Sequence, residues 1–477
     1  MDILKVIFII LEVLLLFNVL IFVHELGHFL AGRWRGLKIE RFAIWFGKPI
    51  WKTKINGVEF CLGWIPAGGY VSLPQMAPME VIEGKSEGPK EVLPPISALD
   101  KIIVAFAGPV FSFGLAIFFA LIVWIVGRPV SESETTTVVG YVDKDSPAEK
   151  AGLQVGDKIL EVDGKPVTKF GGMGASITWR VVRSEGATLA LKVQRGDKIL
   201  ELSAVPIKEK TKILERKSLR QILVDPAQTP IINRIVPDSP AARAGLKRFD
   251  QILAVNGQKL YHFLNLVDYI EKHPGEKLSL TVRREGKIVE IAAQPEIPIK
   301  PPDAKPRIGI TEWVHGGVMD LARPGVPEQI SASVDAMLST FGAVFSPRSD
   351  IKLQHLSGAV KIMNIYYLLF KSEQGWRLAL WFSVIMNVNL AILNLLPVPV
   401  LDGGHIALAL IEAARRKPVS GRILNVVQTS CAIVLISYML YVTFYDIQDL
   451  PWKRKKEKPQ TELQFAPSPD AQRAPAK

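Results

Sequence analysis

Residues 6–23 read VIFIILEVLLLFNVLIFV, and His24-Glu25-Leu26-Gly27-His28 follows at once. A helix of about 20 apolar residues crosses the roughly 30 Å of hydrocarbon in a bilayer. The run has no small-residue cleavage site at its end, which argues against a secretory signal peptide. This stretch therefore predicts a membrane-spanning helix that ends in ionisable side chains.

Three further apolar runs have a similar length. The 477 residues combine a mean hydropathy of +0.22 with 22% charged residues, which indicates apolar spans alternating with ordinary polar segments. We therefore expect a polytopic α-helical membrane protein with four transmembrane helices. The expected spans are 1–30, 101–128, 377–403 and 423–446. The only two cysteines, Cys61 and Cys431, exclude a disulfide framework.

The net charge of +12 is concentrated beside the apolar runs. Basic residues gather in 33–54, after the first run, and in 415–422, between the third and fourth. By the positive-inside rule both loops are cytoplasmic, so the segment from about 129 to 376 lies outside. The basic tail Lys453-Arg454-Lys455-Lys456 disagrees, because four spans place it outside too. No basic face is interleaved with aromatic residues, so nucleic acid is not an expected partner.

The extracytoplasmic segment contains a duplicated module. Residues 145–164 and 238–257 are identical at 12 of 20 positions without gaps. In each copy Ser-Pro-Ala begins a short helix, and Asp-Gly or Asn-Gly forms a hairpin turn. The pattern resembles circularly permuted PDZ domains of bacterial proteases, which implies two α+β PDZ-like domains at 135–206 and 229–297. The resemblance leaves open whether they capture peptides by strand addition or act as spacers or steric gates.

Three other segments connect these parts. Residues 31–100 form the expected cytoplasmic loop, and 447–477 form a basic polar tail. Residues 308–375 follow a Pro/Lys-rich linker and predict an amphipathic helical segment. That segment either guides substrate at the membrane surface or packs on its own domain, and the two readings are equally supported.

The pattern His24-Glu25-x-x-His28 is typical of a zinc site. Side chains at i and i+4 share one face of a helix, so the two imidazoles can bind one Zn²⁺. Glu25 is adjacent and can take a proton from the attacking water. The alternative, two core histidines and a buried glutamate, is disfavoured because an unpaired carboxylate is costly beside a membrane.

A catalytic zinc takes a third protein ligand, and Asp402 is the best candidate. The first and third runs cross in the same direction, so their C-terminal ends reach the same depth. Pro397 and Pro399 break the third run just before Asp402, and non-helical backbone is tolerated at that depth only inside protein or a wet cavity. We do not expect His405 to be a ligand.

Together these motifs resemble the site-2 protease family of intramembrane zinc metalloproteases, in particular its bacterial RseP branch. The likeness rests on H-E-x-x-H in the first span and on Asn394-x-x-Pro397-x-Pro399-x-Leu401-Asp402-Gly403 in the third. It implies that His24, His28 and Asp402 bind zinc and that Glu25 is the catalytic base. It also implies catalytic assistance by Asn394 and substrate positioning by Asn389.

The resemblance extends to 60–71, which is similar to a membrane-associated β-hairpin of the family. It implies that Gly68 and Gly69 help to position substrate by main-chain pairing, whereas the alternative is a plain hairpin. Implied substrates are transmembrane proteins such as anti-sigma factors already cut outside, and signal-peptide remnants. The implied location is a bacterial inner membrane, with periplasmic PDZ-like domains and the zinc near the cytoplasmic side. A non-catalytic membrane adaptor with PDZ modules is the alternative function.

Overall fold

A computed structural model describes residues 3–76, 94, 96–301, 304–372, 374–417, 419–450 and 463–466. Part of the expected loop at 31–100 and most of the expected tail at 447–477 lie outside these residues. The chain forms two compact units. The first comprises Met1–Arg128, Ala322–Leu338 and Leu353–Leu450, and the second comprises Pro129–Leu321, Ser339–Lys352 and Pro451–Lys477.

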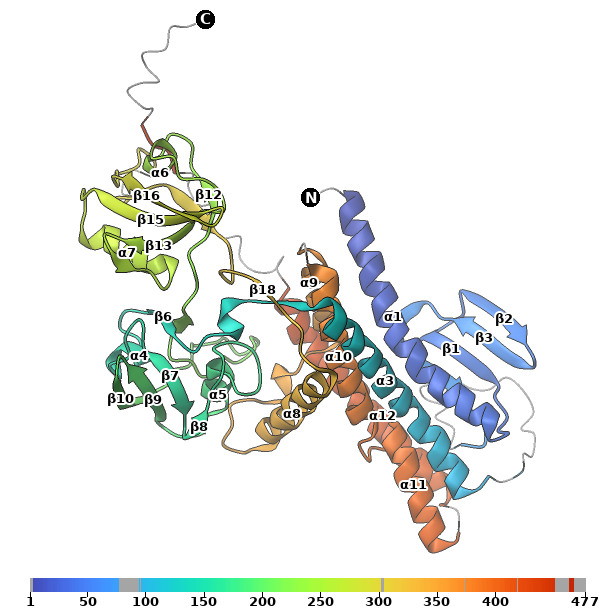
Figure 1. The fold of residues 1–477 in the computed structure, drawn as a ribbon. Coiled ribbons are helices and arrows are strands. Elements are labelled where there is room, and N and C mark those ends of the chain that lie inside the picture. The colour runs from blue at the N-terminus through green and yellow to red at the C-terminus, as the bar shows by residue number, and fades with distance from the viewer. Residues whose placement is uncertain are drawn as a thin grey trace, which may run out of the picture. The chain divides into compact units, whose positions relative to one another are not determined.

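The first unit combines long apolar helices with a four-stranded sheet, and Figure 1 shows this sheet beside α1. Its helices are α1 (Ile3–Trp34), α3 (Ala98–Val126), α9 (Ala359–Phe370), α10 (Gly375–Asn394), α11 (Asp402–Arg415) and α12 (Gly421–Gln448), with a 3₁₀ turn at Leu353–His355. Helix α8 (Val326–Phe345) begins in this unit. The strands are β1 (Arg41–Phe46), β2 (Trp51–Ile55), β3 (Val58–Leu62) and β4 (Ile65–Ser72).

Four helices in the described part of the chain, α1, α3, α10 and α12, are long and apolar enough to cross a membrane. Two differ in extent from the expected spans. Helix α1 continues through the polar residues to Trp34. Helix α10 ends at Asn394 rather than at 403, because the prolines at 397 and 399 cannot continue it, and a new helix begins at Asp402.

Helix α3 is central to the first unit because both α1 and α10 pack against it. Its start is defined by a capping box, in which the Asp100 amide donates to the Ser97 hydroxyl and the Ser97 amide donates to the Asp100 carboxylate. Leu20 of α1, Ala120 of α3 and Val384 of α10 meet in one buried cluster. Small residues such as Ala120 let the helix backbones approach closely.

The sheet corrects the expectation of a β-hairpin at 60–71. Strands β3 and β4 do not pair, because β1 lies between them, parallel to β3 and antiparallel to β4. The reason is that 41–46, expected only as part of a basic loop, forms a strand in which Phe42 and Ala43 are both buried. The order β2-β3-β1-β4 leaves β4 at one edge of the described sheet.

The second unit contains two similar modules, the first repeat (residues 129–226) and the second repeat (residues 230–313). The first contains β5 (Arg128–Val130), η1 (Glu132–Glu134), β6 (Val139–Val142), α4 (Pro147–Lys150), β7 (Lys158–Val162), β8 (Lys165–Pro166), α5 (Ile177–Arg183), β9 (Leu189–Arg195), β10 (Lys198–Ala204) and β11 (Val224–Pro226). The second contains β12 (Ile232–Ile235), α6 (Pro240–Arg243), β13 (Gln251–Val255), β14 (Gln258–Lys259), α7 (Phe263–Lys272), β15 (Leu278–Arg284), β16 (Lys287–Ala293) and β17 (Ile310–Trp313). Strand β18 (Asp320–Ala322) follows.

Both repeats extend beyond the ranges expected from the sequence. Strand β11 pairs with β6, and β17 pairs with β12, so each repeat is closed by a strand that comes after 206 or 297. The expected helical segment at 308–375 is consequently wrong at its start, where 310–313 is a strand. The helices α8 and α9 account for 326–345 and 359–370.

Each repeat contains one buried ion pair in the same place. Arg195 forms two 2.7 Å hydrogen bonds to Asp157, and Arg284 forms bonds of 2.8 and 2.7 Å to Asp250. Both aspartates are only 1% exposed. Each carboxylate also accepts a backbone N–H, and each arginine donates to the carbonyl of the glycine that ends the short helix. This bidentate contact joins the end of the short helix to the end of an inner strand, β9 in the first repeat and β15 in the second.

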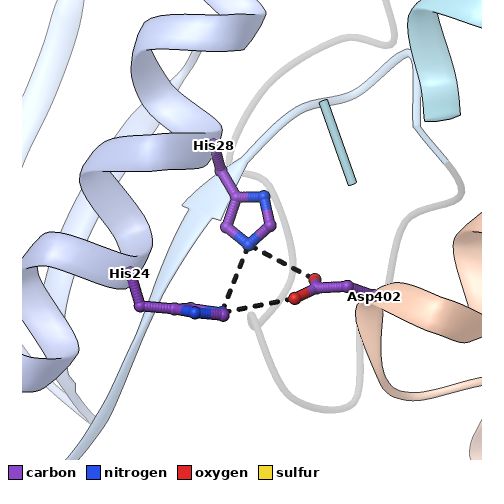
Figure 2. Close-up of side chains that lie close together, drawn as sticks. All are labelled: His24, His28 and Asp402. Atoms are coloured by element: carbon purple, nitrogen blue, oxygen red, sulfur yellow. Dashed lines mark hydrogen bonds and ion pairs between the residues drawn. The ribbon is translucent and has the colours of Figure 1, made fainter. Parts of the chain in front are cut away.

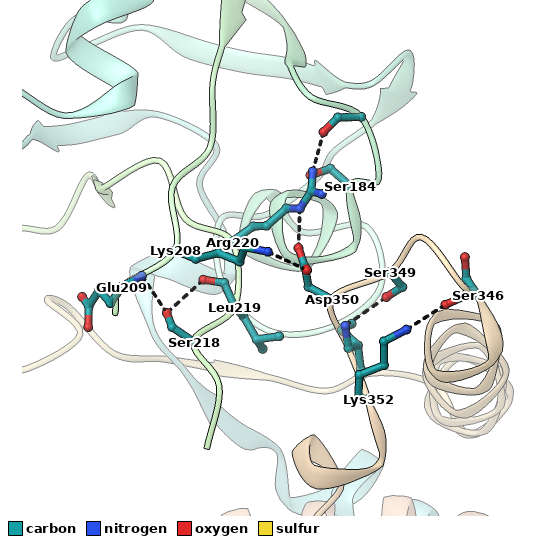
Figure 3. Close-up of polar contacts among 12 residues, drawn as sticks. Ser184, Lys208, Glu209, Ser218, Leu219, Arg220, Ser346, Ser349, Asp350 and Lys352 are labelled. Carbon is teal, nitrogen blue, oxygen red and sulfur yellow. Dashed lines mark hydrogen bonds and ion pairs between the residues drawn. The ribbon is translucent and has the colours of Figure 1, made fainter. Parts of the chain in front are cut away.

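A second polar cluster attaches the stretch after α8 to the first repeat (Figure 3). Asp350 accepts hydrogen bonds from Arg220 Nε at 2.6 Å and from Lys208 Nζ at 2.8 Å. Burial opposes ionisation, but these two cations hold the pKa of Asp350 below its ordinary value. The cluster therefore fixes where the chain leaves the second unit.

We expect Arg284→Met to destabilise the second repeat by about 2–3 kcal/mol, because it leaves the Asp250 carboxylate buried without its cation. Arg195→Met is expected to do the same to the first repeat. Limited proteolysis of the whole protein in detergent measures each effect as faster cleavage within the affected repeat. Arg234→Met is the control, since its partner Glu312 is 50% exposed and loses little. Equal protection of all three variants would contradict the prediction.

Candidate metal centre

The two histidines of the first apolar helix face one another near the end of α1. His24 and His28 are one turn apart, 7% and 9% exposed, and their Nε2 atoms lie 3.3 Å apart. Glu25 lies between them in sequence and is also buried, at 8% exposure. Three ionisable side chains thus share a nearly dry site on one helix.

Asp402 completes the cluster from a distant part of the chain (Figure 2). Its Oδ2 lies 3.3 Å from His24 Nε2 and its Oδ1 lies 3.3 Å from His28 Nε2. The residue opens α11 directly after the break at 395–401. A Cβ on Gly403 would overlap the carbonyl of Leu395, so only glycine lets the chain fold back tightly enough to present the carboxylate.

Helix α3 orients both imidazole rings. His28 Nδ1 lies 2.8 Å from the carbonyl oxygen of Val104, and His24 Nδ1 lies 3.0 Å from the hydroxyl of Ser112. Because a carbonyl only accepts, His28 carries its proton on Nδ1 when neutral and presents the Nε2 lone pair to Asp402. This outward hydrogen bond is the usual support of a metal-ligating histidine.

The arrangement fits a divalent metal. When His28 is neutral its Nε2 lone pair points at the Asp402 carboxylate, and one ligand atom from each of His24, His28 and Asp402 lies within 4.8 Å of the others. Asp402 Oδ2 is buried and has no donor in hydrogen-bond geometry among the described residues, although His24 Nε2 is 3.3 Å away. Zinc bonds of 2.0–2.1 Å in a tetrahedron separate ligand atoms by about 3.3–3.4 Å, which matches these contacts.

The two asparagines of α10 occupy different positions. Asn394 is the last residue of the helix, and its Nδ2 lies 3.3 Å from His24 Nε2. Asn389 is five residues earlier, about 140° around the helix, so its side chain leaves in another direction. Its Oδ1 is buried and has no hydrogen-bond partner among the described residues. The structure therefore brings Asn394 to the centre without doing the same for Asn389.

Strand β4 lies against α1 through Gly69. A Cβ on Gly69 would lie 3.0 Å from both Glu25 Cγ and the Ala43 carbonyl oxygen, so the strand and Glu25 are in close contact. Gly68 has φ +69°, and a Cβ there would overlap the ring of Phe46. Gly69 thus lies beside the metal centre, where a larger residue would push the strand away, whereas Gly68 faces Phe46 of β1.

Sequence reasoning missed the contribution of α3. A Cβ on Gly108 would overlap His28 Nε2, so this glycine makes room for the ring. Neither Gly108 nor Ser112 was among the residues expected at the site. Their spacing of one helical turn was the available signal, whereas the Val104 carbonyl has no side-chain signature.

We expect Gly108→Ala to lower zinc affinity by about 100-fold or more, because the added methyl group displaces the His28 ring. Zinc content of the purified protein, measured by mass spectrometry, checks this. Gly114→Ala in the same helix is the matched control, since a Cβ there meets nothing within 4 Å. Normal zinc content in the Gly108 variant would contradict the role assigned to Gly108 in making room for the His28 ring.

Known proteins resemble this chain over most of its length. A protein of Escherichia coli named "Regulator of sigma-E protease RseP" is 29% identical over 91% of this chain and 97% of its own length. One of Pasteurella multocida named "Putative zinc metalloprotease PM1991" is 30% identical with the same coverage. The solved PDZ domain of an SdrC-like protein from Listeria innocua aligns with 18% of this chain and 97% of its own at 26% identity, with a TM-score of 0.17. Residues 12–438 match Peptidase family M50, so the chain belongs to that family.

Proposed function

We propose that this peptidase hydrolyses membrane-embedded segments of its substrates at a zinc held by His24, His28 and Asp402. The observation that carries the proposal is the convergence of these three side chains, beside Glu25, from helices long enough to cross a membrane. Three protein ligands leave one tetrahedral position for water or substrate, which is the arrangement of catalytic rather than structural zinc. The zinc metalloprotease named among the relatives supports the choice of metal.

Bound zinc would supply Lewis-acid polarisation of the scissile carbonyl. Glu25, buried next to the centre, accepts a proton from the attacking water and returns it to the leaving nitrogen. Asn394 Nδ2 is a donor within 3.3 Å of His24 Nε2 and can stabilise negative charge on the carbonyl oxygen. Val104 and Ser112 keep the rings in place while the proton moves.

Strand β4 is the proposed platform for substrate. A transmembrane helix hides its peptide bonds in internal hydrogen bonds, so the cleaved segment must be extended before water can reach it. An edge strand offers unpaired N–H and C=O groups for that purpose. Gly69 lies against Glu25, so a segment paired with β4 would pass close to the base.

The proposed setting is a bacterial inner membrane, with the zinc near the cytoplasmic side and both repeats, as PDZ-like domains, in the periplasm. The basic segments 33–54 and 415–422 support this orientation. Relatives named "Regulator of sigma E protease" support anti-sigma factors, trimmed outside first, as one substrate class. Signal-peptide remnants are a second class of short membrane-embedded substrate.

Glu25→Gln is expected to reduce cleavage of a reporter span by at least about 10³-fold while zinc stays bound, because the amide cannot accept the proton. Cleavage in proteoliposomes and zinc content are measured together. The matched control is Glu12→Gln, the same change 13 residues earlier in α1, which should cleave normally. Undiminished cleavage by the Glu25 variant would leave the non-catalytic adaptor as the better function.

The same variant identifies substrates. Quantitative membrane proteomics of cells with the native chain or with Glu25→Gln should show membrane-anchored fragments, trimmed on the outer side, that accumulate only with the variant. Accumulation of soluble proteins instead would contradict cleavage within the membrane. Rescue by the native chain is the control.

A further inference from the structure

The C-terminal tail contributes a short strand to the second repeat. The carbonyl oxygen of Gln464 accepts the amide N–H of Ile299 at 2.6 Å and of Lys300 at 3.4 Å, and the Gln464 amide donates to the Lys300 carbonyl at 3.2 Å. The pair Lys300–Gln464 is an antiparallel bridge. A segment that follows the last apolar helix therefore bonds through its main chain to the end of a domain more than 150 residues earlier.

Phe465 anchors this segment. It is 7% exposed, although its neighbours Gln464 and Ala466 are exposed. A Cβ on Gly309 would lie 3.1 Å from the Phe465 ring, so the ring covers that glycine. Arg243 Nη1 adds a hydrogen bond to the Ala466 carbonyl at 3.4 Å. Alternation of exposed and buried side chains with main-chain pairing is the behaviour of a bound strand.

The two repeats differ at the position of Gly309. Gly309 accepts the amide of Val236, and Leu223 in the first repeat accepts the amide of Asp143 at the matching position. Both residues have positive φ, +89° and +58°. The second repeat thus has glycine where the first has leucine, and the Phe465 ring lies beside that glycine.

Membrane topology permits the contact. Two candidate spans, α10 and α12, separate the second repeat from the tail. An even number of crossings returns the chain to the side on which it started, whichever side that is. The tail and the second repeat therefore share one aqueous compartment.

We propose that residues 463–466 are an internal ligand of the second repeat, which holds the C-terminus on the domain and occupies a surface suited to an extended segment with an aromatic residue. The proposal is independent of catalysis at the metal centre. It assigns a role to a tail that lies beyond the family match.

Cysteine cross-linking tests the contact in the full-length chain. Lys300→Cys and Gln464→Cys are combined with Cys61→Ser and Cys431→Ser, and membranes are treated with a mild oxidant. The main-chain-bonded pair has Cα atoms about 5.5 Å apart, which suits a disulfide. We expect an intramolecular link, detected as joined tryptic peptides. A dimer on a non-reducing gel, or no link, would overturn the proposal.

Two charge variants provide the matched comparison. Phe465→Asp should slow cross-linking by at least about tenfold, because a buried aromatic ring is replaced by a carboxylate. Ala466→Asp puts the same charge on an exposed neighbour and should cross-link within about twofold of the parent. Equal rates for both variants would refute the anchoring role of Phe465.

Hydrogen exchange tests the contact without cysteines. Deleting 453–477 should accelerate amide exchange at Ile299 and Lys300 by at least about tenfold, because their acceptor is lost. Exchange in β15 and β16 should stay as in the full chain, which shows that the repeat remains folded. Unchanged exchange at 299–300 would overturn the proposal. Loss of protection throughout the repeat would also contradict it, because the tail would then be part of the folded core of the repeat and not a ligand bound to it.

Discussion

The close approach of α1 and α3 is the constraint on which the metal centre depends. At Gly108 the two helices are so near that a single methyl group would overlap the His28 ring. That distance lets the Val104 carbonyl hydrogen-bond to Nδ1 of His28 and the Ser112 hydroxyl to Nδ1 of His24. Because α10 packs on the same helix, the Asp402 turn arrives at a fixed place. A helix pair even 1 Å further apart would leave the rings without support.

The parts of the site that the sequence could predict are those with a local period or a chain break. His24 and His28 share a face through helical spacing alone, and the prolines at 397 and 399 mark where a carboxylate can leave a helix. The contact between Asp402 and His28 needed a topological argument, since 374 positions separate them. The Val104 carbonyl could not be assigned a role, because a backbone group has no side-chain signature, and the one-turn spacing of Gly108 and Ser112 does not by itself reveal a close approach of two helices.

The fold was predictable to a similar extent and for similar reasons. Helices α1, α3, α10 and α12 follow from run length, and the duplication follows from identities in 145–164. Strand order does not follow, because β1 inserts between β3 and β4 through long-range pairing that competes with a simple hairpin. The closing strands β11 and β17 have three and four residues, too few for alternation to distinguish them from loop.

The basic tail was the one feature that disagreed with the positive-inside rule. The contact between Lys300 and Gln464 gives independent information about the side of the membrane on which the tail lies. The rule describes a statistical preference of basic residues near span ends, worth only a modest free energy per charge. Strand pairing and a buried Phe465 require the tail to share a compartment with the second repeat. An even number of crossings satisfies this requirement in either orientation of the protein in the membrane. The proposed orientation then follows from the two basic loops, 33–54 and 415–422. The charge at 453–456 therefore opposes the proposed topology without being able to reverse it.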